Sequence, residues 1–454
     1  MGRLAPAPPL ADATGDRLVK SVLALLTSSV AGALLGLVFW AVAAHLYPAR
    51  SVGYGAAAIA AMTLLASVAQ LNLGAIFPRY LYASGARARS VLVSGYAASA
   101  FLAVLAGALF VVLTGAHPYL ARDVFPAPLF VVAVVLWVVF SIQDWALTGL
   151  RATFWVPVEN TSFSLIKIGL LPVFAVVAPL SGVFVSWTLP VIACIIPVSY
   201  FLFRKVVPAH VSMSAGRGSL PHARVVGSVL AGEYLGSLSF IALTSLPVLL
   251  VLAKLGAEQT AYFQTPWLIG TSFDFLLFGI ATSLLVESSA RPSVAHTLVP
   301  RAVRLGCLLL LPGCLLLLAG APLILAVLGH QYAAQGTSLL RWLALALPFM
   351  GVNVLYMTFA RMGRRIRRIV AVQVSLAALV LSLTDLLIGH IGIAGAGVAF
   401  TAGQALLACL VLPSVVRQYR REGMAPGFAP NGTLVVRDET QAAEEREMAG
   451  ALGS

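Results

Sequence analysis

Long apolar stretches alternate with short polar segments along most of the chain. Each stretch is close to the roughly 20 residues that a helix needs to cross the hydrocarbon core of a bilayer. Apolar positions follow one another continuously in these stretches, which favours helices over the alternating strands of a membrane β-barrel. The pattern predicts twelve spans, at residues 21–46, 54–76, 91–114, 127–149, 157–178, 182–203, 226–253, 260–285, 302–328, 336–359, 369–389 and 392–415.

Composition supports this interpretation. Of the 454 residues, 60% are apolar and 10% are charged, and the mean hydropathy is +0.96. A soluble domain has roughly 45–50% apolar and about 25% charged residues. Too little polar surface is present to coat a soluble globule, so a soluble enzyme and a disordered chain are both excluded. We expect an all-α integral membrane protein.

The positive residues set the orientation. The net charge of +13 would suggest a nucleic-acid partner in a soluble protein, but in a membrane protein Lys and Arg collect in cytoplasmic loops. With the N-terminus inside, the alternate segments that face the cytoplasm hold 24 of the 29 Lys and Arg. An error of one span would destroy this bias, so both termini are predicted to be cytoplasmic. No nucleic-acid partner is expected.

Six spans lie on each side of a long internal segment. We predict a cytoplasmic N-terminal segment at 1–20, an N-lobe at 21–203, a linker at 204–225, a C-lobe at 226–415 and a cytoplasmic tail at 416–454. Short matches recur about 210 residues apart, for example Gly182-Val-Phe-Val-Ser-Trp-Thr and Gly395-Ala-Gly-Val-Ala-Phe-Thr. An even number of spans per half makes the repeats parallel, related by a pseudo-two-fold axis along the membrane normal. Transporters built this way bind substrate between their halves.

Four phrases carry a family resemblance. They are Leu46-Tyr-Pro-Ala-Arg-Ser-Val-Gly-Tyr-Gly, Leu73-Gly-Ala-Ile-Phe-Pro-Arg-Tyr-Leu, Leu147-Thr-Gly-Leu-Arg-Ala-Thr-Phe-Trp-Val-Pro-Val-Glu-Asn and Gly392-Ile-Ala-Gly-Ala-Gly-Val-Ala-Phe. With them, residues 17–420 resemble the polysaccharide flippase branch of the multidrug/oligosaccharidyl-lipid/polysaccharide exporter superfamily. The resemblance implies a multi-pass protein of the bacterial inner membrane that moves a polyprenyl-diphosphate-linked oligosaccharide from the cytoplasmic to the outer leaflet. It also implies a polysaccharide polymerase and glycosyltransferases as candidate partners.

No motif in the sequence indicates an enzyme. There is no phosphate-binding loop of the Walker A type, no paired His/Glu metal spacing, and no catalytic constellation on a large outer loop. The four cysteines lie in apolar runs and have no CxxC spacing, so they are expected to be buried small side chains. We therefore expect no catalytic residue, no metal site and no cofactor. A coupling ion, H⁺ or Na⁺, is a hypothesis.

Three charged residues fall near the middle of predicted spans. A charge at a helix centre costs roughly 2.5–3.5 kcal/mol on insertion scales, so such residues are candidates for function. Lys167, Glu233 and Asp274 all lie near mid-depth of their spans. In the functional interpretation Lys167 binds the diphosphate, and Glu233 or Asp274 binds a proton or cation that couples transport to an ion gradient. In the structural alternative Lys167 pairs with one carboxylate and joins the lobes.

A second group lies at the predicted inner ends of spans. Asp144 and Glu159 flank Arg151, and Asn160 follows as a candidate hydrogen-bond partner for sugar hydroxyls. These residues form a gate or headgroup site in one interpretation; in the other, they are interfacial side chains with local ion pairs. Arg79 follows an apolar span and a proline and is a candidate diphosphate ligand, or an ordinary topological anchor.

Further polar and aromatic residues have two interpretations each. Arg341 and Asp385 fall near the outer ends of their spans and could form an ion pair, either static or broken during opening. Trp187 and Trp267 are candidates for stacking on sugar rings, with packing as the alternative. The sequence thus predicts a lipid-linked oligosaccharide flippase that works by alternating access. The alternative is a cation-coupled multidrug exporter of the same fold.

Overall fold

The computed structural model describes residues 32–114, 126–213, 223–290, 295–363 and 365–423. All regular structure in these ranges is helical. A helix satisfies its backbone N–H and C=O groups within its own segment, which is what an apolar environment requires. The prediction of an all-α fold is confirmed.

The described chain begins with the helix Gly32–Leu46. The first half continues with α2 (Ala49–Ala69), α3 (Leu73–Ile76), η1 (Phe77–Leu81), η2 (Tyr82–Arg87), α4 (Ala88–Thr114), α5 (Ala127–Gly149), α6 (Trp155–Val177), α7 (Gly182–Phe201), η3 (Leu202–Val206) and α8 (Val207–Met213). The second half contains α9 (Ala223–Leu255), α10 (Ala257–Ala290), α11 (Ala295–Ala326), α12 (His330–Met362), α13 (Ile366–Ile391) and α14 (Ala394–Gly423).

Within the described ranges, eleven helical segments are long and apolar enough to cross a membrane, judged by length and composition. They correspond to eleven of the twelve predicted spans. Gly32–Leu46 is a shorter apolar helix and covers the second part of the predicted span 21–46, whose first part lies outside the described residues. The multi-pass architecture is therefore established, while the cytoplasmic position of the termini stays a prediction.

Several helices are longer than their predicted spans. Helices α9 to α12 have 32 to 34 residues each, about 50 Å at 1.5 Å per residue, whereas the hydrocarbon core is about 30 Å thick. The predicted linker 204–225 is also partly helical, because η3 and α8 continue from α7 to Met213 and α9 begins at Ala223. Hydropathy marks only the apolar part of a helix, so it misses turns that extend beyond the hydrocarbon.

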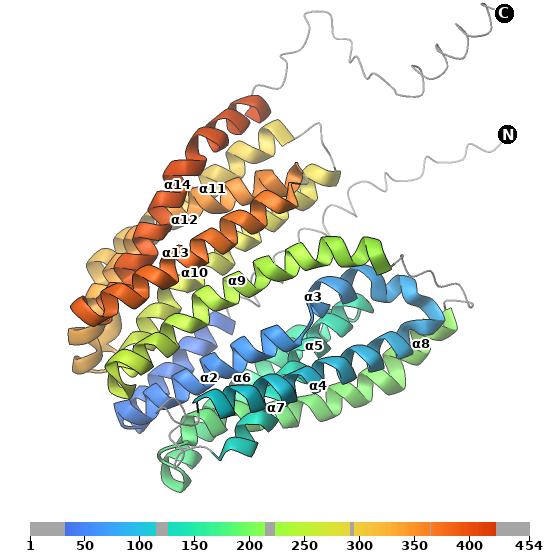
Figure 1. The fold of residues 1–454 in the computed structure, drawn as a ribbon, viewed down its shortest axis with the longest axis horizontal. Helices are drawn as coiled ribbons and strands as arrows, with labels where there is room; N and C mark the ends of the chain where they lie inside the picture. Colours follow the sequence, from blue (N-terminus) through green and yellow to red (C-terminus); the bar gives the residue numbers. More distant parts are fainter. Residues whose placement is uncertain (1–31, 115–125, 214–222, 291–294, 364, 424–454) are drawn as a thin grey trace, which may run out of the picture.

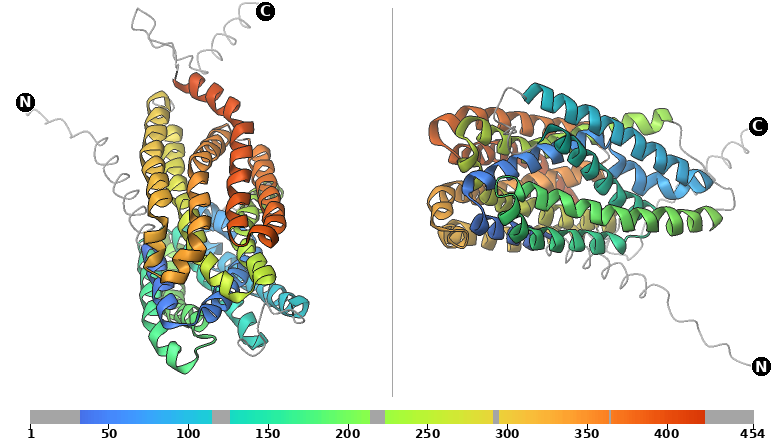
Figure 2. Two further views of the ribbon diagram at one scale, coloured as in Figure 1. Left: turned by 90° about the vertical axis from the view of Figure 1, so that its left-hand side faces the viewer. Right: turned by 90° about the horizontal axis from the view of Figure 1, so that it is seen from below.

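The helices form two groups (Figure 1). One contains Gly32–Leu46 to α8 and the other α9 to α14. The groups lie side by side at the lower left of Figure 1 and diverge toward the opposite end, and the first half of α9 lies beside α3. Figure 2 shows the helices of the second group aligned roughly along one direction. The two halves therefore contact each other mainly through α2, α9 and α10 and separate toward the opposite end.

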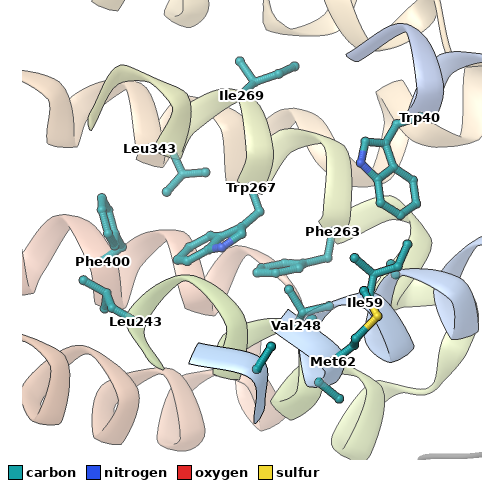
Figure 3. Packing of buried hydrophobic residues seen from close by; sticks show 14 of the residues in the cluster. Trp40, Ile59, Met62, Leu243, Val248, Phe263, Trp267, Ile269, Leu343 and Phe400 are labelled. Atoms are coloured by element: carbon teal, nitrogen blue, oxygen red, sulfur yellow. The ribbon is translucent and has the colours of Figure 1, made fainter. Parts of the chain in front are cut away.

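Helix α2 is the main contact of the N-lobe with the C-lobe, since it packs against both α9 and α10. The contact is apolar: Met62 of α2 lies beside Val248 of α9 and Phe263 of α10, all nearly inaccessible (Figure 3). At the closed end the backbones approach so closely that a side chain on Gly53 would collide with the Ala257 carbonyl. Small residues at such crossings allow membrane helices to pack tightly.

The chain breaks its helix after α2. Leu71 and Asn72 have φ values of +52° and +57°, the left-handed region that asparagine tolerates and leucine rarely adopts. The chain then continues through α3 into the π-helical turn η1, which has Pro78 near its start. Proline cannot donate a helical hydrogen bond, which favours an irregular turn. The break directs the residues of η1 toward α9.

Candidate functional site

An ion pair joins the two lobes where η1 faces α9. Arg79 Nη1 lies 2.7 Å from Glu233 Oε2, and Arg79 Nη2 lies 2.9 Å from Glu233 Oε1. Both carboxylate oxygens thus accept from the planar guanidinium, the strongest geometry for such a pair. The side chains are 49% and 27% exposed, so the pair remains within reach of solvent and ligands.

Two further residues surround this pair. Arg361, in the last turn of α12, is half-buried and within electrostatic range of Glu233, with its guanidinium carbon 5.7 Å from the centre of the Phe278 ring. Tyr234 donates a hydrogen bond of 2.5 Å to the Val68 carbonyl of α2. We call Arg79, Glu233 and Arg361 the inter-lobe charge cluster. It contains two cations, one from each lobe, and one anion.

A second polar cluster is buried inside the N-lobe. Asn160 of α6 donates from Nδ2 to Asp144 Oδ2 of α5 at 2.9 Å. The other oxygen of Asp144, both carboxylate oxygens of Glu159 and the hydroxyl of Tyr96 are buried, and none has a hydrogen-bond partner in the described ranges. Asp144, Glu159 and Tyr96 are close enough to interact electrostatically. We call these four residues the N-lobe carboxylate cluster.

This cluster has no counter-ion among the described residues. Glu159 is only 3% exposed, and neither it nor Asp144 forms an ion pair with a Lys or Arg of the described chain. An isolated buried carboxylate is very unfavourable unless it is protonated or paired. The described residues include no group of three or more His, Cys, Asp or Glu that could hold a metal ion. The arrangement therefore suits a proton, which two close carboxylates can share, or one monovalent cation.

Lys167 of α6 lies in a different part of the N-lobe, inside an aromatic cage. Its Nζ is 3.7 Å from the ring centre of Trp187, 4.7 Å from that of Phe163 and 5.3 Å from that of Phe39, and the residue is 4% exposed. The aromatic faces stabilise the ammonium by cation–π attraction, worth about 2 kcal/mol when desolvated. The expected ion pair between Lys167 and a carboxylate is absent from the described residues, so that structural alternative is wrong.

The remaining predicted site residues lie apart. Asp274 on α10 is half-buried, and no hydrogen bond or ion pair is recorded for it among the described residues. Arg151 follows α5 with a φ of +61° and places its guanidinium carbon 4.1 Å from the centre of the Tyr82 ring. It is exposed and, within the described chain, does not pair with Asp144 or Glu159. The expected local ion pair at the end of this span is therefore wrong.

Two other expectations are corrected. The pair of Arg341 with Asp385 does not form: Arg341 Nε donates to the Leu318 carbonyl, and Asp385 Oδ1 lies 2.6 Å from Lys254 Nζ. The sequence places Lys254 in a loop, but α9 extends to Leu255 and brings it beside α13.

The two tryptophans chosen for sugar stacking have other contacts. Trp187 covers Lys167 and packs against Trp137 and Phe39. Trp267 is 3% exposed, and its indole Nε1 donates to the Thr244 carbonyl at 2.9 Å. Both rings therefore pack within the lobes in this conformation.

The structure thus brings together Arg79 with Glu233, and Asp144 with Glu159 and Asn160, but it does not bring Lys167 to either group. Sequence reasoning missed Tyr96 and the contribution of Arg361. A tyrosine in an apolar span gives a weak signal, and Arg361 is concealed in a basic run that topology explains. The pairing of Arg79 with Glu233 joins positions 154 residues apart, which no local pattern reveals.

Comparison of the whole chain with solved structures identifies transporters. An inward-facing multidrug resistance MATE family transporter of the MOP superfamily superposes with a TM-score of 0.65 at 14% identity, over 87% of this chain and 96% of that one. An outward-facing MATE family transporter of the same superfamily gives 0.59 at 15% identity, over 89% and 97%. The lipid II flippase MurJ in an inward closed conformation gives 0.56 at 13% identity, over 88% and 90%.

No protein-family model and no curated protein matches the chain. At these identities the structural likeness concerns the fold. The proteins that it resembles in fold are transporters and a flippase. The chain has the fold shared by MATE transporters and the flippase MurJ.

Proposed function

We propose that this chain is a MOP superfamily flippase that moves a polyprenyl-diphosphate-linked oligosaccharide from the cytoplasmic to the outer leaflet of a bacterial inner membrane. The transporter fold and the four sequence phrases that resemble polysaccharide flippases support this proposal. In the predicted topology both termini are cytoplasmic, and the diverging end of the lobes faces the cytoplasm. A polysaccharide polymerase and glycosyltransferases are the proposed partners.

One observation carries the choice of an anionic substrate: the inter-lobe charge cluster has two arginines and one carboxylate. A guanidinium presents a planar set of donors that matches phosphate oxygens. Arg79 and Arg361 come from opposite lobes, so a ligand that contacts both would bind the lobes in one defined arrangement. A cationic drug would meet a net positive charge there.

The lobes provide the shelter that the headgroup needs. Sugar hydroxyls and phosphates that enter hydrocarbon without partners cost several kcal/mol each. We propose that the oligosaccharide and diphosphate pass between the lobes while the polyprenyl chain stays in the bilayer. Rocking of the lobes about the α2 contacts with α9 and α10 would then exchange the inward and outward states.

We assign ion coupling to the N-lobe carboxylate cluster. Glu159 and Asp144 need a proton or a monovalent cation such as Na⁺ to remain buried, and the lack of a counter-ion for them in the described part of the chain supports this role. Release of that ion in one conformation would link transport to the ion gradient. Lys167 is proposed as a second cationic contact for the diphosphate, in a state in which its aromatic cage opens.

A multidrug exporter is the second candidate, and Asp274 is the observation that favours it. This half-buried carboxylate has no recorded ion pair in the described chain and could accept a cationic drug. Glu233 is less suitable because Arg79 already neutralises it, and Glu159 is enclosed within the N-lobe. The two functions therefore predict opposite effects of removing Arg79 on transport. The flippase should lose transport, whereas the exporter should gain it, because Glu233 is then no longer neutralised.

The test is transfer between leaflets in liposomes. Wild type, Arg79→Gln and the control Arg50→Gln are reconstituted with a fluorescent polyprenyl-diphosphate oligosaccharide or, separately, a cationic dye. Arg50 is an exposed arginine whose side chain bonds to Tyr54 and lies outside the inter-lobe charge cluster, so it matches the charge change elsewhere. We expect wild type and Arg50→Gln to transfer the lipid and Arg79→Gln to lose at least about tenfold in rate. Dye export without lipid transfer would support the exporter.

A further inference from the structure

The inter-lobe charge cluster contains a competitor for its own ligand. Glu233 occupies the fork of the Arg79 guanidinium that Nη1 and Nη2 form, at 2.7 and 2.9 Å. An anion that is to bind bidentately to this fork must first displace the carboxylate. Specificity in proteins often depends on such a built-in penalty against the wrong ligand as much as on favourable contacts.

We propose that Glu233 makes the transporter select lipid diphosphates over lipid monophosphates. The inference rests on the proposed function, because it concerns the same substrate path. Glu233 acts here as a selectivity residue, and Arg79 and Arg361 are the groups that contact the phosphates.

The charges explain the discrimination. A sugar linked to a polyprenyl chain through one phosphate carries a single negative charge, the same as the carboxylate that it must displace. A diphosphate in the same position carries two negative charges and has oxygens on two phosphorus atoms. It can therefore occupy the Arg79 fork with one phosphate and approach Arg361 with the other, which matches two cations with two anionic charges.

Because Glu233 is tethered beside Arg79, it competes more strongly with a ligand for the guanidinium. A carboxylate held on α9 has a high effective concentration at Arg79, so a ligand that offers only an equal interaction does not displace it. At the same time, Glu233 is 27% exposed and Arg79 is 49% exposed, so a better ligand can enter and the carboxylate can turn toward water. The exposure makes the exchange feasible, and the bidentate geometry makes it selective.

The contact between the lobes does not depend on this pair alone. The Tyr234 hydroxyl bonds to the Val68 carbonyl next to it, and Met62, Val248 and Phe263 form an apolar contact further along α2 and α9. Loss of the Glu233 charge should therefore leave the lobes in place. Glu233→Gln removes the charge but keeps the size of the side chain, which makes it a suitable test.

The experiment uses two fluorescent lipids that differ only in the linkage: the same oligosaccharide on a polyprenyl diphosphate or on a polyprenyl monophosphate. Leaflet transfer is measured in liposomes for wild type, Glu233→Gln and the control Glu258→Gln. Glu258 is an exposed carboxylate of α10 that bonds to Tyr262 and lies outside the cluster, so it matches the chemical change. We expect wild type and Glu258→Gln to prefer the diphosphate by at least about tenfold.

In Glu233→Gln this preference should fall toward equality, through faster transfer of the monophosphate. If wild type transfers neither lipid, the proposed function fails and this inference fails with it. If wild type prefers the diphosphate and Glu233→Gln keeps the full preference, the function stands and the selectivity role of Glu233 is refuted. Equal transfer of both lipids by wild type, or loss of all transfer in folded Glu233→Gln, would also refute that role.

Discussion

The interiors of the two lobes differ in the kind of polar group that they bury. In the C-lobe, Asn353 donates to both the carbonyl and the side-chain oxygen of Gln404, at 3.0 and 2.7 Å. The buried oxygens without partners in the described C-lobe belong to uncharged side chains such as Thr384. In the described N-lobe, both oxygens of Glu159 lack hydrogen-bond partners, and Lys167 is enclosed by aromatic rings.

This difference indicates where ion chemistry can take place. A neutral polar group without a partner costs about 1–3 kcal/mol, whereas a charge costs more and responds by binding a proton or an ion. The described N-lobe core therefore holds the groups that can change charge state, whereas the buried oxygens without partners in the described C-lobe, Asn353 Oδ1 among them, belong to uncharged side chains. Asp274 is the C-lobe carboxylate that departs from this rule, although it is only half-buried.

The largest expected effect comes from removing the charge of Glu159. We expect Glu159→Gln to fold, since the amide needs no counter-ion, but to lose the dependence of transport on an imposed proton or Na⁺ gradient. Gradient-driven transfer should fall by at least about tenfold, to the rate without a gradient. The measurement is leaflet transfer in liposomes with and without each gradient, and an unchanged response would exclude Glu159 from coupling.

In the C-lobe we expect the opposite outcome for Asn353→Ala. This change leaves the Gln404 side chain without its donor and should lower the free energy of unfolding by about 1–3 kcal/mol. Coupling to the gradient should remain, because no charge is removed. Thermal unfolding in detergent measures the first effect and the gradient assay the second. Loss of coupling in a folded Asn353→Ala protein would break the distinction between the lobes.

The smallest expected change in stability comes from Lys167→Met. The cation–π attraction is worth about 2 kcal/mol when desolvated, but burial of an unpaired charge costs roughly 2.5–3.5 kcal/mol. The thioether also packs favourably on aromatic rings. Stability should therefore stay within about 1 kcal/mol of wild type, measured by thermal unfolding. A much larger loss would show that the ammonium is a structural element of the N-lobe.

Hydropathy and charge distribution predict most of the fold, because span length and apolar content are local properties. The helical class and eleven of the spans follow directly from them. The continuation of α7 through η3 and α8 to Met213 and the full length of α12 do not, since helices continue beyond the hydrocarbon where residues become polar. The left-handed backbone conformation of Leu71 and Asn72 could not be predicted from the sequence either.

The candidate site was only partly predictable. Charged residues within spans stand out by their cost, so Lys167, Glu233 and Glu159 could all be selected from the sequence. Their partners could not, because the Arg79 pair and the aromatic cage depend on how distant helices meet. The sequence suggested one common polar level between the lobes, whereas the structure has an inter-lobe charge cluster and a separate polar cluster inside the N-lobe.

The central claim is that Arg79 at the contact between the lobes binds the diphosphate of the substrate. The most direct measurement is equilibrium binding of the polyprenyl-diphosphate oligosaccharide to purified wild type, Arg79→Gln and Arg50→Gln proteins in detergent, without transport. We predict that Arg79→Gln raises the Kd at least about tenfold while Arg50→Gln binds like wild type. Equal affinity of all three proteins would contradict the account.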